Sequence, residues 1–302
     1  YPYFLYSIKK IFVFAEDYYV IVVLLIQLIL FLISIHIFKK ILSEIFFNKK
    51  VVIVGIFIFT IFPLNVYAVG QISSIELQIF LFLLFIYNFI IIYKYSSFLN
   101  LIYFSFFSGL LILLRGEFFI FYIFSITFLI LKKKNFYLIL SSIFITLVVL
   151  SPYLIRNYNI FGTLALTKST GFNLLKGNNP KSKVEGIGMW YGYDVIPELE
   201  QELKKITPVK NYDLISDKIF LKHGIKLIKE DPLKYLRLYI KKFFSFLFID
   251  IESTYPGYYS VFNILPKIFI SCLTIISLIY FFSKKINLFN YFASLYIFNA
   301  LI

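Results

Sequence analysis

The sequence contains few charged residues and only one cysteine. Of its 302 residues 15% are charged, whereas 60% are hydrophobic and the mean hydropathy is +0.85. Soluble domains carry about 25% charged residues, so an ordinary soluble protein is excluded. The hydrophobic content also excludes an intrinsically disordered chain. The single cysteine, Cys272, lies inside an apolar run, which excludes a disulfide framework and a cysteine-based metal site.

Common catalytic and nucleotide-binding motifs are absent as well. The chain has no Gly-x-Gly-x-x-Gly pattern, P-loop, His-Glu-x-x-His or Gly-x-Ser-x-Gly. Its net charge is +14, but many of the cations form short clusters between apolar runs. The charge therefore indicates contact with a membrane and gives no reason to expect a nucleic-acid partner.

Eight apolar runs have the composition of membrane helices. They cover residues 19–38, 51–69, 76–93, 99–114, 118–131, 135–155, 266–282 and 288–302. The first run has 20 residues, which at about 1.5 Å per residue crosses a hydrocarbon core about 30 Å thick. Runs 99–114 and 118–131 are short and could be two thin spans or one re-entrant pair. We therefore expect an all-α, polytopic transmembrane protein with about eight spans.

Lysines concentrate in every second short loop between these runs. The ten lysines concerned are Lys39, Lys40, Lys49, Lys50, Lys94, Lys132, Lys133, Lys134, Lys284 and Lys285. The intervening short loops contain one cation, Arg115. The positive-inside rule then places the lysine loops in the cytoplasm and both chain ends outside. We expect a transmembrane region over 1–155, a large periplasmic loop over 156–265, and C-terminal membrane helices over 266–302.

The second half of the large loop is predicted to contain an amphipathic helix. Asp231 is a suitable N-cap and Pro232 a suitable first-turn residue. Six apolar residues then share about 100° of helical arc: Leu233, Leu236, Ile240, Phe243, Phe244 and Leu247. Basic residues flank them at Lys234, Arg237, Lys241 and Lys242. Such a helix either lies on an anionic membrane surface or packs on the protein's own outer face.

One carboxylate and two arginines lie at the predicted outer boundary of the membrane. Glu76 opens the third span, Arg115 follows the fourth and Arg156 follows the sixth. The planar fork of arginine suits a phosphate group, and lipid phosphates lie at this depth. A carboxylate there can act as a general base or hold a metal ion or an arginine. Arg115 and its neighbour Glu117 are equally consistent with a role as interfacial anchors.

Four stretches resemble the bacterial membrane glycosyltransferases of the GT-C class. They are residues 1–5, 73–77, 109–115 and a longer block that covers 152–162 and 171–180. The last block is the most specific, because it is similar to the family's outer-loop signature: proline-aromatic-x-x-Arg-Asn, then Gly-x-Asn-Leu, then Gly-Asn-Asn-Pro. Within that class the stretches resemble the dolichyl-phosphate-mannose-protein mannosyltransferase-like group, which includes aminoarabinose transferases.

The resemblance implies an inverting enzyme at the outer face of the inner membrane. Such an enzyme moves a sugar from a polyprenyl-phosphate donor to an acceptor, which could be lipid A, a protein or another glycan. It implies that Glu76 orients the acceptor or a divalent cation, and that Arg115 and Arg156 bind the donor phosphate. The signature residues shape the outer loop over the site or form turns; they are Asn157, Asn173, Gly177, Asn178 and Asn179.

The resemblance also implies that a part of the enzyme precedes residue 1. Family members carry the main catalytic aspartate in an outer loop upstream of the segment similar to residues 1–5, so we expect an internal fragment that is inactive alone. Two other functions stay open: a transporter or flippase for lipid-linked saccharides, and a polymer-ligase-type membrane protein. A transporter would need polar residues deep within its spans and inverted repeats, whereas the predicted spans hold almost no polar residues and no repeat is visible.

Overall fold

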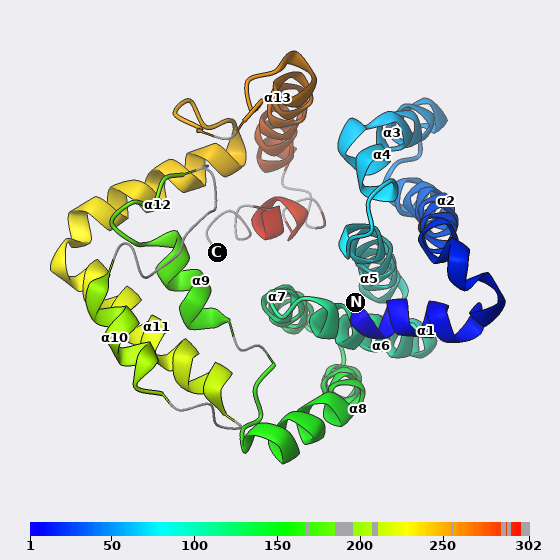
Figure 1. The fold of residues 1–302 in the computed structure, drawn as a ribbon. Coiled ribbons are helices and arrows are strands. Elements are labelled where there is room, and N and C mark those ends of the chain that lie inside the picture. Colours follow the sequence, from blue (N-terminus) through cyan, green and yellow to red (C-terminus); the bar gives the residue numbers. More distant parts are fainter. Residues whose placement is uncertain are drawn as a thin grey trace. The chain divides into compact units, whose positions relative to one another are not determined.

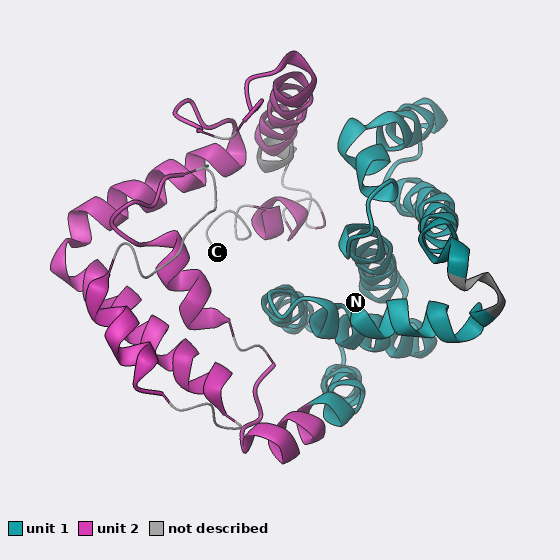
Figure 2. Cartoon of the chain, viewed as in Figure 1, with its two compact units in different colours: residues 1–153 teal, residues 154–302 magenta. Residues whose placement is uncertain are grey.

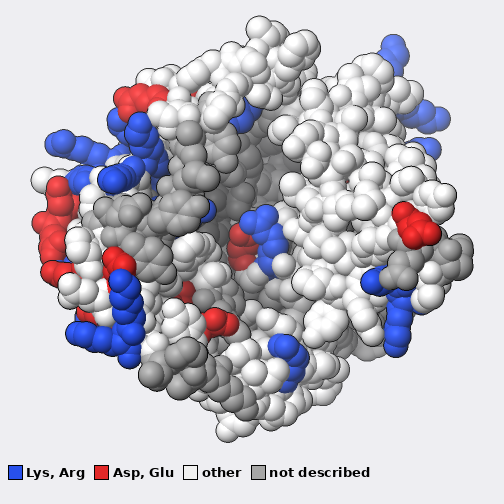
Figure 3. Space-filling model, in the orientation of Figure 1, with Lys and Arg blue, Asp and Glu red and all other residues white. Residues whose placement is uncertain are grey.

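The computed structural model describes residues 1–166, 169–184, 196–206, 211–254, 256–284, 288 and 291–296, without the side chains of 14–16 and 281–284. Within these ranges the chain is helical and forms no strand, which confirms the predicted all-α class (Figure 1). The chain divides into two compact units, residues 1–153 and 154–302 (Figure 2). Figure 3 shows that charged side chains gather over α10–α12 of the second unit, whereas most of the visible surface of the first unit is uncharged.

Unit 1, residues 1–153, is built from apolar helices. These are α1 (Pro2–Ile11), the 3-10 helix η1 (Val13–Tyr18), α2 (Tyr19–Ile45), α3 (Lys49–Ile61), α4 (Pro63–Val69), α5 (Ile75–Tyr95), α6 (Phe98–Leu114), α7 (Phe118–Leu131) and most of α8 (Phe136–Phe161). Helix α5 packs against both α2 and α6. Its wholly buried Phe85 and Phe89 lie beside Phe104 of α6, and the ring centroids of Phe85 and Phe104 are 5.0 Å apart. Aromatic packing around α5 is thus the core of this unit.

Four helices are long and apolar enough to cross a membrane. They are α2, α5, α8 and the segment Val261–Tyr280 of α13. Helices α3 and α4 are a fifth candidate if they form one span, although they are bent by 52°. Pro63 explains the bend, because it lacks an N–H and favours the extended backbone observed at Phe62. Helices α6 and α7 are apolar but have only 17 and 14 residues.

Helices therefore occupy seven of the eight predicted runs, and the eighth, 288–302, lies mostly outside the described residues. The four long helices are candidate membrane spans by length and composition, while the number of eight spans stays a prediction. The helices also cross the predicted region boundaries, since α8 continues to Phe161 and α13 already begins at Val261.

The lysine-rich loops of unit 1 lie together. Lys94 donates to the carboxylate of Glu44 with an Nζ–Oε2 distance of 3.0 Å, which joins the ends of α5 and α2. Lys134 Nζ lies 3.2 Å from Ser96 Oγ, which adds the loop between α7 and α8. These contacts agree with the alternation expected from the lysines. The side of the membrane on which the loops lie stays a prediction.

Buried polar side chains link three helices of unit 1, contrary to the expectation that the spans hold almost none. Ser105 of α6 donates to Ser142 of α8 at an Oγ–Oγ distance of 2.7 Å. The hydroxyl of Tyr122 on α7 lies 3.1 Å from the same Ser142 Oγ, and Thr146 donates to the carbonyl of Ser105 at 3.2 Å. The expectation of spans almost without polar residues was wrong. Isolated serines in apolar runs give no sign in the sequence that they face one another in the fold. Such bonds between helices are a means of holding membrane helices together.

Among its described residues, unit 2 (154–302) contains the remainder of α8, five labelled helices and a short helical stretch at 291–296. The labelled helices are α9 (Thr170–Gly177), α10 (Pro197–Lys204), α11 (Tyr212–Glu230), α12 (Pro232–Leu247) and α13 (Val261–Lys284). Helix α11 packs on α9, α10 and α12. The predicted helix over 231–247 is confirmed: Asp231 is its N-cap, and the Asp231 carboxylate accepts a hydrogen bond from the backbone N–H of Lys234 at 3.1 Å.

Candidate functional site

Glu76 is the most unusual charged residue in unit 1. It lies in the first turn of α5, where the helix dipole favours a negative charge. Its side chain is wholly buried, and among the described residues neither carboxylate oxygen has a hydrogen-bond partner. Burial of a carboxylate without hydrogen bonds is costly, so a residue in this state is a candidate for a functional role.

Arg115 is held by two partners at the C-terminal end of α6. Its Nε lies 3.1 Å from Glu117 Oε1 and its Nη2 lies 3.3 Å from Glu117 Oε2, while Nη1 donates to Gln78 Oε1 at 3.0 Å. Gln78 follows Glu76 by two positions, so their side chains leave α5 about 200° apart. The structure therefore brings Arg115 to Gln78 and Glu117, and it does not bring Arg115 into hydrogen-bond contact with Glu76.

Arg156 and Asn157 lie near the C-terminal end of α8, in unit 2. Arg156 is exposed and donates from Nη1 to Asn157 Oδ1 at 3.1 Å. Asn157 is buried, and its Nδ2 donates to the carbonyl of Ala165 at 2.7 Å. Asn157 thus ties the chain that leaves α8 back to the helix and orients the arginine beside it. Most of the guanidinium donors of Arg156 point to no described residue and are available to an anion.

The remaining signature residues form helix α9 and the turn after it. Asn173 is exposed and lies 3.5 Å from Ser169 Oγ through its Nδ2. The side chains of Asn178 and Asn179 donate to the carbonyls of Leu174 and Lys176 at 2.9 and 3.0 Å. Asn178 and Asn179 therefore stabilise the end of α9 and act in turns, one of the two roles that the sequence left open.

Helix α9 is packed tightly on α11 through two glycines. A methyl group on Gly171 would lie 2.0 Å from the carbonyl oxygen of Asp217 and 2.6 Å from the backbone nitrogen of Leu221. A methyl group on Gly224 would lie 3.3 Å from the side chain of Leu174. In addition, Asp217 accepts a hydrogen bond from the backbone N–H of Phe172 at 2.9 Å. Asp217 was not identified from the sequence, because its partner lies 45 residues away along the chain.

Lys242 connects the signature turn to α12. Its ammonium donates to the carbonyl of Gly177, the last residue of α9. Burial lowers the pKa of the Lys242 amine below its ordinary value, because the charged form loses contact with water. A basic residue of the predicted amphipathic helix is therefore turned inward, where it holds the signature block in place.

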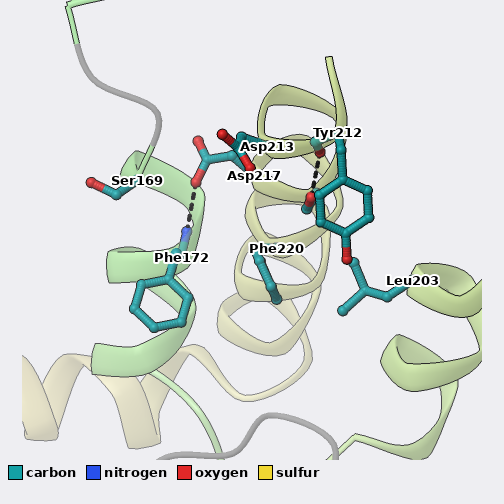
Figure 4. Close-up of a pocket in the computed structure, with 8 residues that line it drawn as sticks. Ser169, Phe172, Leu203, Tyr212, Asp213, Asp217 and Phe220 are labelled. Carbon is teal, nitrogen blue, oxygen red and sulfur yellow. Dashed lines mark hydrogen bonds between the residues drawn. The ribbon is translucent and has the colours of Figure 1, made fainter. Parts of the chain in front are cut away.

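A pocket of about 460 Å³ opens in unit 2 between α9, α10 and α11 (Figure 4). Its lining residues are Ser169, Phe172, Leu203, Tyr212, Asp213, Ser216, Asp217 and Phe220. Two carboxylates one helical turn apart and three aromatic rings give it both polar and apolar walls. Within the described part of the chain no group of three or more His, Cys, Asp or Glu residues is arranged to hold a metal ion.

Comparison of the chain with protein-family models, with curated proteins and with solved structures gives no match. The likeness to the GT-C class therefore rests on the residues quoted from the sequence.

Proposed function

We propose that this chain belongs to a GT-C class membrane glycosyltransferase that moves a sugar from a polyprenyl-phosphate donor to an acceptor at the outer face of the inner membrane. The proposal includes about eight spans, cytoplasmic lysine loops and a periplasmic loop over residues 156–265. Its support is the order of the quoted stretches, the helical architecture with four candidate spans, and the state of Glu76. The buried carboxylate of Glu76, without a hydrogen-bond partner among the described residues, carries the proposal.

In this mechanism the lipid phosphate remains at the membrane boundary when the sugar leaves it. Arg156 has guanidinium donors without a partner among the described residues and would bind the phosphate directly, since arginine can donate two parallel hydrogen bonds. Arg115 would bind it only after exchanging Glu117 for the phosphate, because Glu117 already occupies two of its donors. Glu76 is wholly buried, so it would have to become accessible before it could accept a hydrogen bond from the acceptor hydroxyl and orient it toward the sugar.

Substitution of Glu76 tests the proposal. In protein expressed from its complete reading frame, Glu76→Gln should lower the turnover of sugar transfer by about 100-fold or more, because glutamine keeps the shape and loses the charge. Glu44→Gln is the matched control, since Glu44 is also a carboxylate at the end of a membrane helix but pairs with Lys94. Transfer is measured in isolated membranes from a radiolabelled polyprenyl-phosphate sugar to lipid and protein fractions.

Near wild-type transfer by Glu76→Gln would limit Glu76 to a helix-terminus role, which contributes about 0.3–1 kcal/mol. Movement of the intact labelled lipid across the bilayer, with no label passed to an acceptor, would instead support the transporter or flippase. The buried hydroxyls of α6–α8 do not favour that alternative, because they are bonded to one another across the helices.

A further inference from the structure

Helix α12 leaves four of the six residues of its apolar stripe exposed, whereas Phe243 and Leu247 are half-buried. Leu233, Leu236, Ile240 and Phe244, called here the α12 apolar face, are 66%, 53%, 44% and 54% exposed. Their spacing of three and four residues places them on one side of the helix. The buried residues of α12, Tyr235 and Ser245, lie on other sides. An amphipathic helix of a soluble domain buries its apolar side, so the reversed orientation of α12 indicates an apolar environment outside the unit.

The residues beside the α12 apolar face are basic. Between Pro232 and Leu247 the helix contains four cations and no acidic residue. Lys242 is turned inward to Gly177 and Lys241 pairs with Glu252 at 2.9 Å. Arg237 is exposed, follows Leu236 directly and has no polar partner among the described residues. This arrangement of exposed apolar side chains with a free arginine at their edge is complementary to an anionic lipid surface.

The C-terminal end of α12 lies against a candidate membrane span. The carbonyl of Phe248, which follows α12, accepts a hydrogen bond from Ser271 Oγ of α13 at 3.4 Å. Ser271 lies within the span Val261–Tyr280, four residues beyond Lys267, or about 6 Å along the helix axis. The side chain of Lys267 lies over the ring of Tyr258, with the ammonium 4.2 Å from the ring centroid. Ser271 is the eleventh of the 20 residues of this span, so one end of α12 is fixed against the middle part of a candidate membrane helix.

We propose that α12 is an interfacial helix whose apolar face rests in the boundary between head groups and acyl chains of a bilayer that contains anionic phospholipid. Arg237 contacts the lipid phosphates, and the inward Lys242 and Tyr235 fix the rotation of the helix so that the apolar face points to the lipid. The bilayer is favoured over a protein partner because the residue that directly follows α12, Phe248, is hydrogen-bonded to a helix that is itself a candidate span. This surface is separate from Glu76 and does not depend on sugar transfer.

Spin-label accessibility in vesicles tests the proposal. In a Cys272→Ser background a nitroxide is attached at Ile240→Cys, on the α12 apolar face, or at Lys229→Cys, an exposed position on α11 that serves as the matched control. The full chain is reconstituted in mixed phosphatidylcholine and phosphatidylglycerol vesicles, and collisions with oxygen and with a water-soluble nickel chelate are compared. Oxygen should be favoured at position 240 and the chelate at position 229.

Two outcomes would overturn the proposal. A label at position 240 that meets the nickel chelate as often as the label at 229 would show that the face lies in water. A label at 240 that is immobile and inaccessible to both reagents would show that the face is covered by protein, either a second copy or another part of the chain.

The charge of Arg237 is tested in the same vesicles. Arg237→Gln should shift the label at position 240 toward the aqueous reagent when phosphatidylglycerol is present, and should leave it unchanged in pure phosphatidylcholine. If Arg237→Gln changes the accessibility of the label equally in both kinds of vesicle, or in neither, Arg237 does not recognise anionic lipid. A free phosphate is distinguished from a lipid head group by adding inorganic phosphate, which should not reproduce the shift.

Discussion

Arg115 is paired with Glu117 and not with Glu76. Arg115 and Glu117 meet through two parallel contacts, Nε to Oε1 at 3.1 Å and Nη2 to Oε2 at 3.3 Å. Both side chains are about half exposed. A phosphate group that approaches Arg115 would seek the same donors as the carboxylate. Glu117 is therefore expected to compete with an anionic ligand for Arg115.

Removal of this competitor gives the first prediction. If Arg115 binds the donor phosphate, Glu117→Gln should lower the KM for the polyprenyl-phosphate sugar by up to about fivefold, because an exposed ion pair contributes about 0.2–1 kcal/mol. Arg115→Ala should raise the same KM, and Arg115→Ala combined with Glu117→Gln should behave as Arg115→Ala alone. An unchanged KM in all three variants would leave Arg115 and Glu117 as interfacial anchors.

The sequence predicted the helices well because membrane helices depend on local composition. The length of the apolar runs predicted α2, α5 and α8, and the Asp231-Pro232 pair predicted where α12 begins. Contacts between distant segments were not predictable in this way. The link between Arg115 and Gln78 joins residues 37 positions apart, and neither side chain carries a local signal of its partner.

The candidate site was predicted only in part, because its contacts also join residues that are far apart in the sequence. Glu76 was selected because a carboxylate at a membrane boundary needs an explanation; the structure buries it completely, and its role in the site stays a prediction. The rotation of α12 was not predictable, because the sequence places an apolar stripe on the helix without showing what it faces. The inward turn of Lys242 toward Gly177 decides the orientation, and it depends on a contact across 65 residues.

The predicted membrane topology is tested by cysteine labelling. In a Cys272→Ser background, Lys183→Cys should react with an impermeant thiol reagent from the periplasmic side, and Asn135→Cys only after the membrane is permeabilised. Lys183 is exposed, and its substitution leaves the neighbouring Ser182 free to hold the turn through its bonds to the backbone of Lys176 and Asn179. The reverse pattern would place the lysine loops outside and reject the proposed outer site.

Ser142 is predicted to stabilise unit 1 through its two hydroxyl partners. Ser142→Ala removes the contacts with Ser105 and Tyr122, and should lower the free energy of unfolding by on the order of 1 kcal/mol. Ser141→Ala is the matched control, since Ser141 bonds only to the backbone of its own helix at Tyr137. Unfolding is followed in a mixed-detergent titration. Equal losses in the two variants would show that the link between helices adds no stability.

Gly171 is predicted to be irreplaceable at the contact between α9 and α11. Gly171→Ala should force the two helices apart, because the added carbon would meet backbone atoms that cannot move as a side chain can. The expected destabilisation is about 1–3 kcal/mol or more. Gly70→Ala should be tolerated, since the nearest atom would lie at 3.6 Å. Protease resistance of residues 170–182 reports the separation, and an unchanged digestion pattern in Gly171→Ala would contradict the close packing.

The last prediction concerns the pH dependence that Lys242 gives to unit 2. Its folded-state pKa is lowered by burial, whereas the unfolded chain keeps the ordinary value of about 10.5. Below the lowered pKa the amine is charged in both states, and the cost of burying the charge is fully present. As the pH rises through the lowered pKa the folded state releases its proton first, so this cost disappears and stability increases.

Wild-type protein should therefore gain stability relative to Lys242→Met as the pH is raised from neutral toward the ordinary lysine pKa of about 10.5. Methionine has a similar length and no charge, so Lys242→Met lacks this source of pH dependence. In the wild type, the neutral amine of Lys242 can still donate to the carbonyl of Gly177. Thermal unfolding of the purified protein is compared at each pH, with Lys229→Met as the control for an exposed lysine. If the stability difference between wild type and Lys242→Met is constant over this range, Lys242 is not desolvated in the folded protein and its contact with Gly177 does not form as described.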